Sequence, residues 1–466
     1  MIRRHAMALR LALAGVDASS AVVLFVVVSL VRFGPAWQDT WRRAGVDPFV
    51  AAAVYAVAWS TVLWALGLYR VRARWQLRTE ILDVARAGIL LGLVTFSALF
   101  VVKLPDVSRL FLLLLFVAQV ALTIASRASI RWLLRSLRDR GLGLRYLLVV
   151  GTGREARRFA DRVERHRELG LRVIGFLAVE PGQTTIDHRP VIGVLDDIEV
   201  VLHDRIVDEV AVCLSEPDLH LLESITRLCE EEGKIVRIPL EGVPVSLPGG
   251  RIEDFDRGKV LSLVYGPDRI VGLIVKRLLD IGLAAAALLL LSPLFLIVAW
   301  AIVVLDGRPV IFRQTRVGLH GRPFLVVKFR TMVPDAEARL DELEALNEIK
   351  GHAFKLTDDP RLTRTGSFLR KTSIDELPQL WNVIRGEMSL VGPRPPLPRE
   401  VAGYDLWHRR RLSMKPGITG LWQVAARGEE DFDRWVALDL AYIDRWSVWL
   451  DLKIMFRTIP AMLQGR

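Results

Sequence analysis

The first part of the chain alternates long apolar segments with short basic loops. The apolar segments run over Leu9–Val31, Phe49–Tyr69, Val84–Val102 and Leu110–Ala125. Each is close to the ~20 residues that an α-helix needs to cross a bilayer. The first is too long for the apolar core of a cleavable signal peptide, and three more follow it. The pattern predicts a transmembrane region of four spans over residues 1–126.

Arginine residues distinguish the two sides of this region. They gather before the first segment, between the second and third, and after the fourth, as Arg3, Arg4, Arg10, Arg70, Arg72, Arg74, Arg78, Arg127, Arg131, Arg135, Arg138 and Arg140. By the positive-inside rule, both ends of the block and everything after Arg127 are predicted to be cytoplasmic. Asp17 lies inside the first segment. An intramembrane carboxylate is a functional candidate, and helix packing or an interfacial position is the alternative.

The pattern of apolar and polar residues changes at Arg145, where RYLLVV is followed by a glycine turn and a basic amphipathic segment. The apolar runs RVIGFL, EVAVCL and KIVRIPL follow, with helical periodicity between them. This alternation predicts a Rossmann-like α/β domain with a parallel sheet over residues 127–245.

Gly151 and Gly153 stand where such a fold turns from strand into helix, which makes them a possible nucleotide turn. The turn has a purely structural interpretation too, because no clear acidic residue ends a well-placed second strand to hold a ribose. The chain also contains no Tyr-x-x-x-Lys. This disfavours a short-chain dehydrogenase type of epimerase or dehydratase.

Residues 246–270, in a stretch rich in Gly and Pro, are expected to form a linker. Beyond them, Ile281–Leu305 runs for about 25 residues without a charge, and Ser292-Pro293 interrupts its middle. An internal proline removes a backbone hydrogen bond and kinks a helix. Because both flanks are predicted to be cytoplasmic, we predict a re-entrant helix over residues 278–305, within a catalytic domain of residues 271–466. The alternative is a fifth, kinked span.

Composition narrows the class of ligand. The chain has 466 residues, is 52% hydrophobic and carries a net charge of +11. A basic excess on an apolar chain favours anionic lipid headgroups or phosphorylated substrates. We expect no nucleic-acid partner, because no groove-reading motif is present. Cys213 and Cys229 fit neither a disulfide framework nor metal-ligand spacing.

The most charged stretch is Lys371–Pro396, KTSIDELPQLWNVIRGEMSLVGPRPP. Its prolines favour stiff turns over regular structure. Basic side chains beside carboxylates, ahead of a Gly-Pro-Arg-Pro turn, suit a phosphate-handling site with a divalent metal. The alternative is a solvated charged loop.

A family resemblance rests on an ordered set of motifs that begins at Lys276. The set comprises Lys276-Arg277-x-x-Asp280, Ser292-Pro293, Phe312-Arg313-Gln314-x-Arg316-x-Gly318, Lys328-Phe329-Arg330-Thr331-Met332, Asp375-Glu376-Leu377-Pro378-Gln379, Gly392-Pro393-Arg394-Pro395 and Pro416-Gly417-Ile418-Thr419-Gly420. Together they closely resemble the bacterial sugar transferases, the polyprenyl-phosphate sugar-1-phosphate transferases that start exopolysaccharide and O-antigen assembly. The spans and the α/β domain resemble the large members of this family by architecture rather than by motif.

The resemblance implies a reaction. A nucleotide diphosphate sugar gives its sugar-1-phosphate to undecaprenyl phosphate, and the nucleoside monophosphate leaves. It also implies a covalent aspartyl intermediate and an Asp-Glu pair that holds Mg²⁺. The residues after the Lys-Phe-Arg-x-Met motif match this pair as Asp335 and Glu337, with Ala336 between them. Asp335 is therefore the expected nucleophile, with Glu376 and Glu387 as further candidates for sharing the metal. Capping of a following acidic helix over 336–346 is a rival role for Asp335.

Other residues of the motifs are expected to bind substrate and phosphate. Planar guanidinium groups suit phosphate clamps, and Arg330, Arg370 and Arg394 are the candidates. The full expected set is Lys276, Arg277, Arg313, Arg316, Lys328, Arg330, Arg370, Asp375, Glu376 and Arg394, with Ser292 and Pro293 at the helix break. Trp435, Tyr442, Trp446 and Trp449 lie on amphipathic segments that would either rest at the membrane interface or pack within the domain.

The expected fold class is thus a four-span membrane bundle, a Rossmann-like α/β domain and a mainly α catalytic domain anchored by the re-entrant helix. At the family level we expect UDP-glucose or UDP-galactose as donor, a bacterial inner-membrane location and a possible homodimer. Two other functions remain open. One is a nucleotide-sugar-modifying enzyme centred on Gly151, and the other is a non-enzymatic scaffold of polysaccharide assembly.

Overall fold

The computed structural model describes residues 2–463 except 70–76, 103–107, 140–143, 166–169, 183, 241–249, 256–257, 266–269, 344–346, 349–350, 353, 355, 357–358 and 427–430. By contacts between residues, the chain forms two compact units. The first comprises Met1–Leu144 with Asp161–Arg172 and Glu253–Lys259. The second comprises Arg145–Ala160, Val173–Ile252 and Val260–Arg466.

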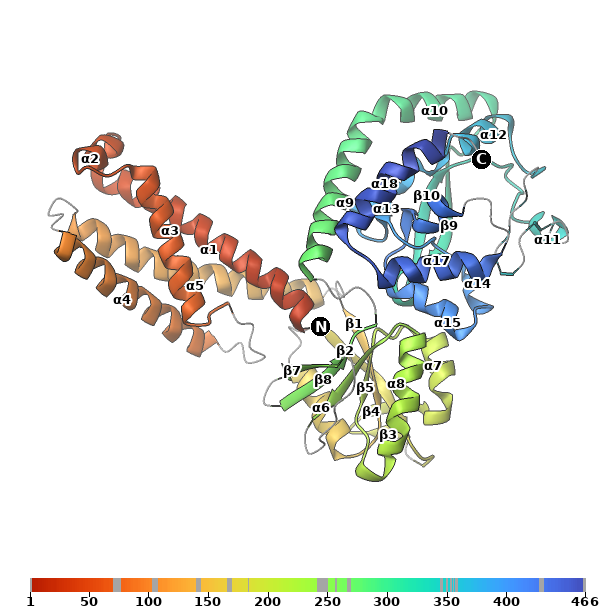
Figure 1. Ribbon diagram of the computed structural model, residues 1–466, viewed down its shortest axis with the longest axis horizontal. Coiled ribbons are helices and arrows are strands. Elements are labelled where there is room, and N and C mark those ends of the chain that lie inside the picture. The colour runs from red at the N-terminus through yellow and green to blue at the C-terminus, as the bar shows by residue number, and fades with distance from the viewer. Residues whose placement is uncertain are drawn as a thin grey trace. The chain divides into compact units, whose positions relative to one another are not determined.

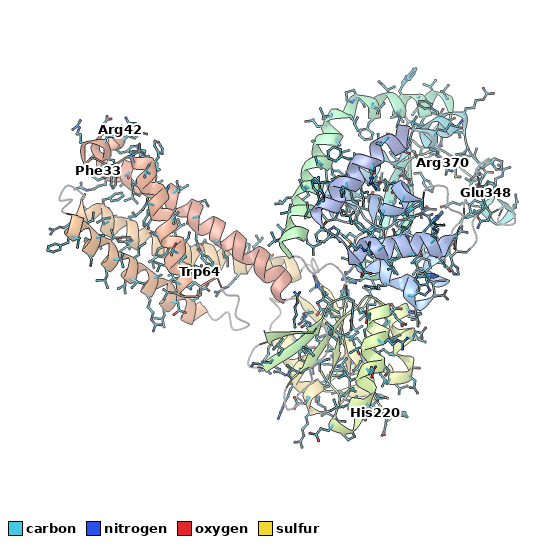
Figure 2. All side chains as sticks on the ribbon, viewed as in Figure 1. Phe33, Arg42, Trp64, His220, Glu348 and Arg370 are labelled. Atoms are coloured by element: carbon cyan, nitrogen blue, oxygen red, sulfur yellow. The ribbon has the colours of Figure 1, made fainter. Side chains whose placement is uncertain are left out.

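The first unit contains a helical bundle. Its helices are α1 (Ile2–Phe33), α2 (Trp37–Arg43), α3 (Pro48–Ala65), α4 (Leu77–Val102) and α5 (Arg109–Asp139). All but the short α2 are long and apolar enough to cross a membrane, over Leu13–Phe33, Pro48–Ala65, Glu80–Val101 and Arg109–Leu133. The four predicted apolar helices are therefore present, each long and apolar enough to span a bilayer. Apolar side chains such as Trp64 point outward from the bundle, as a lipid environment favours (Figure 2).

Buried charges hold three helices of the bundle together. The guanidinium of Arg127 on α5 donates to Asp17 on α1 at 2.9 Å and to Glu80 on α4 at 2.8 Å. Arg127 and Asp17 are both almost fully buried. Asp17, predicted as an intramembrane carboxylate, is thus paired and joins helices, because a buried charge needs a partner.

The second unit contains most of an eight-stranded sheet in the order β3-β4-β2-β1-β5-β6-β8-β7 (Figure 1). Its strands are β1 (Arg145–Val150), β2 (Leu171–Ala178), β3 (Thr185–Ile186), β4 (Arg189–Val194), β5 (Glu209–Val212), β6 (Ile235–Pro239), β7 (Arg251–Phe255) and β8 (Gly258–Leu263). The helices α6 (Arg154–Arg165), α7 (Ile198–Asp204) and α8 (Leu222–Glu231), with the 3₁₀ turns η2 (Leu195–Asp197) and η3 (Glu216–Leu221), connect them. We call residues 144–263 the α/β domain.

The sheet confirms an α/β domain and corrects two details. β1, β5 and β6 pair in parallel, and their buried Val- and Leu-rich runs are typical of strands covered on both faces. β3 and β8 pair antiparallel to their neighbours, so the sheet is mixed rather than parallel. β7 and β8 fall within residues 246–270, which were expected to be a linker. β7 is an edge strand of the sheet and β8 lies next to it, and their Gly- and Pro-rich surroundings obscured both in the sequence.

The C-terminal domain, residues 270–463, carries two small sheets among its helices. Strands β9 (Ile311–Val317) and β10 (Pro323–Phe329) form an antiparallel hairpin around the 3₁₀ turn η4 (Leu319–Gly321), and β11 (Ser389–Val391) pairs in parallel with β12 (Gly417–Thr419). The helical elements are α9 (Ile270–Leu290), α10 (Ser292–Leu305), α11 (Leu340–Leu343), α12 (Arg364–Lys371), η6 (Ile374–Gln379), α13 (Leu380–Arg385), α14 (Pro398–Ala402), α15 (Leu406–Arg409), η7 (Arg410–Ser413), α16 (Leu421–Ala425), α17 (Phe432–Asp444) and α18 (Val448–Leu463). The domain is mainly α, as predicted, with the hairpin as an addition.

Helices α9 and α10 meet at the predicted break and differ in direction by 60° (Figure 1). Pro293 occupies the first turn of α10, where its missing N–H costs nothing. The hydroxyl of Ser292 donates to the carbonyl of Leu289 at 2.8 Å and so satisfies one acceptor at the end of α9. The sequence Ser-Pro therefore ends one helix and starts the next.

Two expectations near the end of the chain are resolved. The acidic helix expected over 336–346 is reduced to α11, and residues 344–346 lie outside the described part. Of the four aromatic residues expected on the final helices, Trp435, Tyr442 and Trp446 are buried, whereas Trp449 is 66% exposed. Three of the four rings therefore pack within the C-terminal domain rather than facing outward.

Candidate active site

The β9–β10 hairpin places three polar side chains on one face. Its register pairs Arg316 with Phe324, Gln314 with Val326, and Phe312 with Lys328. Directly opposed residues of an antiparallel pair share a face, and alternate residues of a strand do as well. Gln314, Arg316 and Lys328 therefore point the same way, while Arg313 lies on the other face and is exposed. The structure does not bring Arg313 to the group of charges described below.

The Asp375-Glu376 pair lies opposite this face on the turn η6. Ser373 precedes the turn with φ of 55°, and Pro378 stiffens it from within. Asp375 is only 7% exposed. Glu376 accepts a hydrogen bond of 2.7 Å from the ammonium of Lys328, so the pair and the hairpin meet directly.

The two neighbouring carboxylates have opposite electrostatic environments. Burial and the adjacent charge of Glu376 raise the pKa of Asp375 to about 6, although Lys328 and Arg370 oppose the shift. Burial also acts to raise the pKa of Glu376, but Lys328 and then Arg394 and Arg316 outweigh it, so that pKa is lowered. At neutral pH the arrangement therefore favours an ionised pair beside concentrated positive charge.

Two guanidinium groups supply more of that positive charge. Arg316 donates to the backbone carbonyl of Pro395 at 3.0 Å and to Gln314 at 2.8 Å. Burial and the nearby charge of Arg394 lower the pKa of Arg316 to about 10. Arg394 donates to the buried Glu400 at 3.4 Å, and its guanidinium lies 5.9 Å from the ring centre of Trp435. Two cations held this close to each other suit a ligand with more than one negative charge.

Lys276 and Arg277, both expected to bind phosphate, instead hold α9 to the C-terminal domain. The ammonium of Lys276 donates to Asp451 at 2.7 Å and to the carbonyl of Val391 at 2.9 Å. The guanidinium of Arg277 donates to the carbonyls of Val383 and Ile384 at the end of α13, at 2.6 and 2.9 Å. A guanidinium at a helix C-terminus satisfies carbonyls that lack intrahelical donors.

Arg330 also has a structural role. It is buried, and one of its nitrogens donates to the carbonyls of Asp306 and Gly307, both at 2.6 Å, at the end of α10. Arg370 is exposed on α12 and donates to the hydroxyl of Thr331 at 3.3 Å (Figure 2). Of the three expected clamps, Arg394 lies among the site's charges, Arg370 lies at its edge, and Arg330 supports the turn after α10.

Asp335 and Glu337 lie on a turn at the edge of the site. The side chain of Asp335 is 63% exposed, and its carboxylate lies 3.8 Å from Arg339. Glu337 accepts a hydrogen bond of 3.2 Å from Gln314, whose own oxygen holds Arg316. Asp335 thus pairs with Arg339, whereas Lys328 and Arg370 act on the carboxyl of Asp375.

Gln314, Glu400 and Trp435 contribute to the site but were not among its predicted residues. Gln314 and Glu400 orient Arg316 and Arg394, and Trp435 lies beside Arg394. Strand alternation through Gln314-x-Arg316 could have identified Gln314 from sequence. The other two come from distant positions, and no local signal connects them to the site.

The residues present can be tested against the expected Mg²⁺. Among the described residues, no group of three or more His, Cys, Asp or Glu side chains could hold a metal ion. Mg²⁺ is commonly held by one or two carboxylates together with substrate phosphates and water, rather than by a full protein cage. The adjacent carboxylates of Asp375 and Glu376 fit that requirement.

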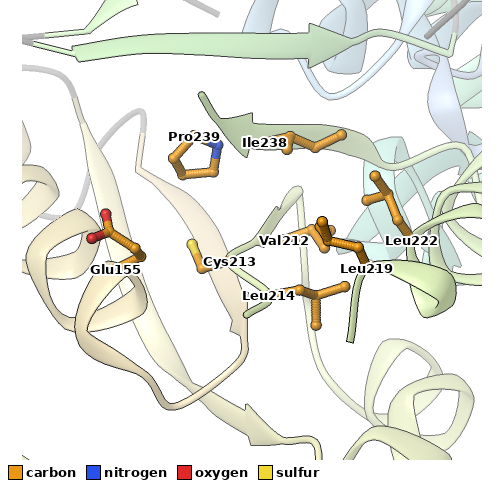
Figure 3. A pocket seen from close by; sticks show the side chains of 8 residues that line it. All are labelled: Glu155, Val212, Cys213, Leu214, Leu219, Leu222, Ile238 and Pro239. Atoms are coloured by element: carbon orange, nitrogen blue, oxygen red, sulfur yellow. The ribbon is translucent and has the colours of Figure 1, made fainter. Parts of the chain in front are cut away.

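The Gly151 turn has a structural reason of its own. Gly151 has φ of +102°, and a Cβ there would lie 2.2 Å from the carbonyl oxygen of Cys213, so only glycine fits. A Cβ on Gly153 would meet nothing within 4 Å. Beyond the turn a small pocket opens at the carboxyl ends of β5 and β6, where Glu155 approaches from α6 (Figure 3); it is lined by Glu155, Val212, Cys213, Leu214, Leu219, Leu222, Ile238 and Pro239.

Comparison with known proteins places these observations in a family. The family model described as bacterial sugar transferase matches residues 271–465, and one described as CoA-binding domain matches residues 64–238. The UDP-glucose:undecaprenyl-phosphate glucose-1-phosphate transferase of Xanthomonas campestris pv. campestris is 31% identical over 481 residues, which covers 99% of this chain and 95% of that protein. The chain belongs to the bacterial sugar transferase family.

Two further relatives show how the match is distributed. The galactosyl transferase CpsE of Streptococcus agalactiae is 44% identical over 248 residues, 52% of this chain, and the chain spans 55% of that protein. The exopolysaccharide production protein ExoY of Sinorhizobium fredii is 43% identical over 205 residues, 43% of this chain and 91% of that protein. The resemblance inferred from the motifs is thereby confirmed, and this sugar transferase contains the charged site on its C-terminal domain.

Proposed function

We propose that this chain transfers a sugar-1-phosphate from a nucleotide diphosphate sugar to undecaprenyl phosphate in the membrane. The relatives' names include such a glucose-1-phosphate transferase and a galactosyl transferase. UDP-glucose and UDP-galactose are accordingly the first donors to test. The proposal depends on one observation. The carboxylates of Asp375 and Glu376 lie beside three cations, which are Lys328, Arg316 and Arg394. Cleavage of a pyrophosphate needs this combination of a carboxylate and several cations.

We further propose Asp375 rather than Asp335 as the nucleophile. The Asp-Glu pair that the family chemistry requires is contiguous at Asp375-Glu376 and interrupted at Asp335-Ala336-Glu337. Asp375 is buried near Lys328 and Arg370, whereas Asp335 is exposed and pairs with Arg339. A carboxylate can accept a phosphoryl group when the charge on that group is neutralised by its surroundings.

The transfer then has two balanced steps. A carboxylate oxygen of Asp375 attacks the phosphorus that bears the sugar, and the bond from that phosphorus to the bridging oxygen breaks. The nucleoside monophosphate leaves with the bonding electron pair. A phosphate oxygen of undecaprenyl phosphate then attacks the same phosphorus, and the Asp375 carboxylate is released. Arg316, Arg394 and Lys328 hold the phosphate oxygens and offset their charge in both steps.

Mg²⁺ would be held by Asp375 and Glu376 together with donor phosphates, where it would supply charge neutralisation. Glu376 remains ionised for this role because Lys328 keeps its pKa low.

We propose that α9 and α10 form a re-entrant anchor at the cytoplasmic face of the bacterial inner membrane. Apolar side chains are exposed along both helices, including Leu278, Leu289, Leu296 and Trp300. The acceptor's phosphate lies at headgroup level while its chain remains in lipid, so an anchor in one leaflet would keep the site at that boundary. A homodimer is a further proposal, tested by the mass of the purified protein in detergent or native-like lipid.

The test is release of nucleoside monophosphate by the purified protein, with undecaprenyl phosphate, Mg²⁺ and a panel of UDP- and GDP-sugars. We expect release with one donor, dependent on the lipid, and loss of release in Asp375→Asn but not in Asp335→Asn. Donor labelled in the sugar should label the protein when the lipid is left out, and Asp375→Asn should abolish that label. The opposite pattern between the two variants would return the nucleophile to Asp335. No release with any donor would refute the function.

A further inference from the structure

A partly buried ion pair joins the α/β domain to the hairpin that carries part of the site. Asp208, immediately before β5, is fully buried. Its two carboxylate oxygens accept from the two terminal nitrogens of Arg322 at 2.8 and 2.6 Å. One of them also accepts from the backbone N–H of Tyr146 at 2.8 Å. Such a two-point pair fixes orientation as well as distance.

A second contact lies at the turn between α8 and β6. The carboxylate of Glu232, also buried, is 2.9 Å from Arg409 on α15. Next to it, Gly233 has φ of +65°, and a Cβ there would lie 2.8 Å from the Cβ of Ser413. The backbone of the α/β domain therefore fits closely against η7, and the residues of both contacts belong to the second compact unit.

The contact between Asp208 and Arg322 matters because of where Arg322 lies. Arg322 lies between η4 and β10, at the closed end of the hairpin, next to the pair Pro323–Val317. Gln314, Arg316 and Lys328 follow along the same two strands. An interaction that fixes the turn of a hairpin limits how its strands can tilt, and thus limits where their side chains point.

The comparison with a small relative separates catalysis from positioning. The alignment with the Sinorhizobium fredii protein spans 205 residues, which is 91% of that protein. Its length is close to that of the sugar transferase match at residues 271–465 of this chain. Because only 9% of that protein lies outside the match, we take the sugar transferase domain as the part that carries the chemistry. Any contribution of Asp208 to the reaction therefore acts through the hairpin.

We propose that the α/β domain positions the hairpin of the active site through Asp208 and Arg322, so that this contact controls donor binding. The proposal rests on the proposed function for its kinetic readout. Asp208 is a positioning residue, because it touches Arg322 and Tyr146 rather than the reacting groups. Loss of the contact would leave Arg316 and Lys328 present but less well placed for the donor's phosphates.

The experiment is a double-mutant cycle in the full chain with Asp208→Asn, Arg322→Gln and the combination. We expect each single variant to raise the KM for the donor about threefold to tenfold with kcat changed less, and the two effects not to add. Arg445→Gln, at an exposed arginine of the same domain, is the matched control and should leave both constants unchanged. Donor KM values unchanged in both single variants, or effects that multiply in the combination, would overturn the proposal.

A second measurement does not depend on turnover. Amide hydrogen exchange over residues 311–329 should become faster in Arg322→Gln, whereas exchange in β1 and β5 should change less. If the wild-type chain shows no donor turnover but the hairpin responds in this way, the proposed function fails and the coupling stands. If the hairpin does not respond, the coupling is wrong whatever the activity is.

Discussion

Lys328 and Glu376 are 48 positions apart in the chain, and their side chains form a hydrogen bond of 2.7 Å. Lys328 comes from a strand and Glu376 from a 3₁₀ turn. This contact lowers the pKa of Glu376 while the neighbouring Asp375 keeps a raised pKa. Lys328 acts to lower the pKa of both carboxyls, but burial and the charge of Glu376 outweigh it at Asp375.

Lys328→Met should abolish most of the activity. The change keeps an unbranched side chain one atom shorter but removes the charge that keeps Glu376 ionised and offsets donor phosphates. We expect kcat for nucleoside monophosphate release to fall about 10²–10³-fold, the scale seen when one preorganised charge-stabilising donor is lost. Lys371→Met, at an exposed lysine of the same stretch, should leave kcat within twofold. Equal losses in both variants would contradict a specific role for Lys328.

Arg394→Lys should weaken donor binding more than it slows the chemistry. Lysine keeps the charge but cannot reproduce the planar two-point contact of a guanidinium with phosphate. We expect the donor KM to rise about tenfold, equal to the loss of roughly one charge-assisted hydrogen bond. Arg399→Lys, at an exposed arginine nearby, is the control. A KM that does not change in Arg394→Lys would remove Arg394 from the donor site.

Lys276→Met should destabilise the C-terminal domain rather than alter donor recognition. It would leave the buried Asp451 without its cation, although Tyr442 and Trp446 still donate to that carboxylate. We expect a loss of about 3–5 kcal/mol in the free energy of unfolding, measured by thermal or chemical unfolding in detergent. Combining it with Asp451→Asn should restore part of that stability. A variant as stable as wild type with a raised donor KM would support phosphate binding by Lys276 instead.

Gly151→Ala and Gly153→Ala should differ in stability. The added Cβ at position 151 meets a backbone carbonyl in a left-handed conformation, whereas the one at position 153 meets open space. We expect the first to cost about 1–3 kcal/mol of stability in the α/β domain and the second less than about 0.5 kcal/mol. Domain-resolved hydrogen exchange measures both. Similar costs would show that the turn does not depend on glycine at position 151.

Removal of divalent cations should stop the reaction reversibly. Two adjacent carboxylates among arginines provide only part of a Mg²⁺ coordination sphere, so the ion should be exchangeable. We expect EDTA to abolish nucleoside monophosphate release and added Mg²⁺ to restore it, with the unfolding temperature little changed. Full turnover after exhaustive chelation would exclude Mg²⁺ from the mechanism.

The apolar pattern predicted the spans, the helix break and the α/β domain because these features depend on local sequence. The length and polarity of a segment determine whether it can span a bilayer. Ser292-Pro293 breaks the helix however the rest of the protein packs around it. The short strands β7, at the edge of the sheet, and β8, next to it, were missed because a short strand in a Gly- and Pro-rich region has little periodicity of its own. The pairing of β8 is decided by β6, which lies earlier in the chain.

The site was predicted less completely, because motif membership does not say which way a side chain points. Arg313 and Arg316 are in one motif, but strand alternation puts them on opposite faces. Arg277 and Arg330 are in basic motifs, yet their guanidinium groups bind backbone carbonyls at the ends of helices. These outcomes depend on contacts between segments far apart in sequence, which residue type and spacing do not determine.

The 60° bend between α9 and α10 limits how deeply a re-entrant anchor can enter the membrane. When the two arms are equally inclined, each lies about 30° from the membrane plane, and the 14 residues of α10, about 21 Å long, then descend about 10 Å. That depth is less than half of the ~30 Å hydrocarbon thickness. The anchor would act as a wedge that spreads the lipids of one leaflet and leaves the other continuous. It would therefore respond to membrane curvature and to lateral tension, and its own insertion would open no route for protons or ions across the bilayer.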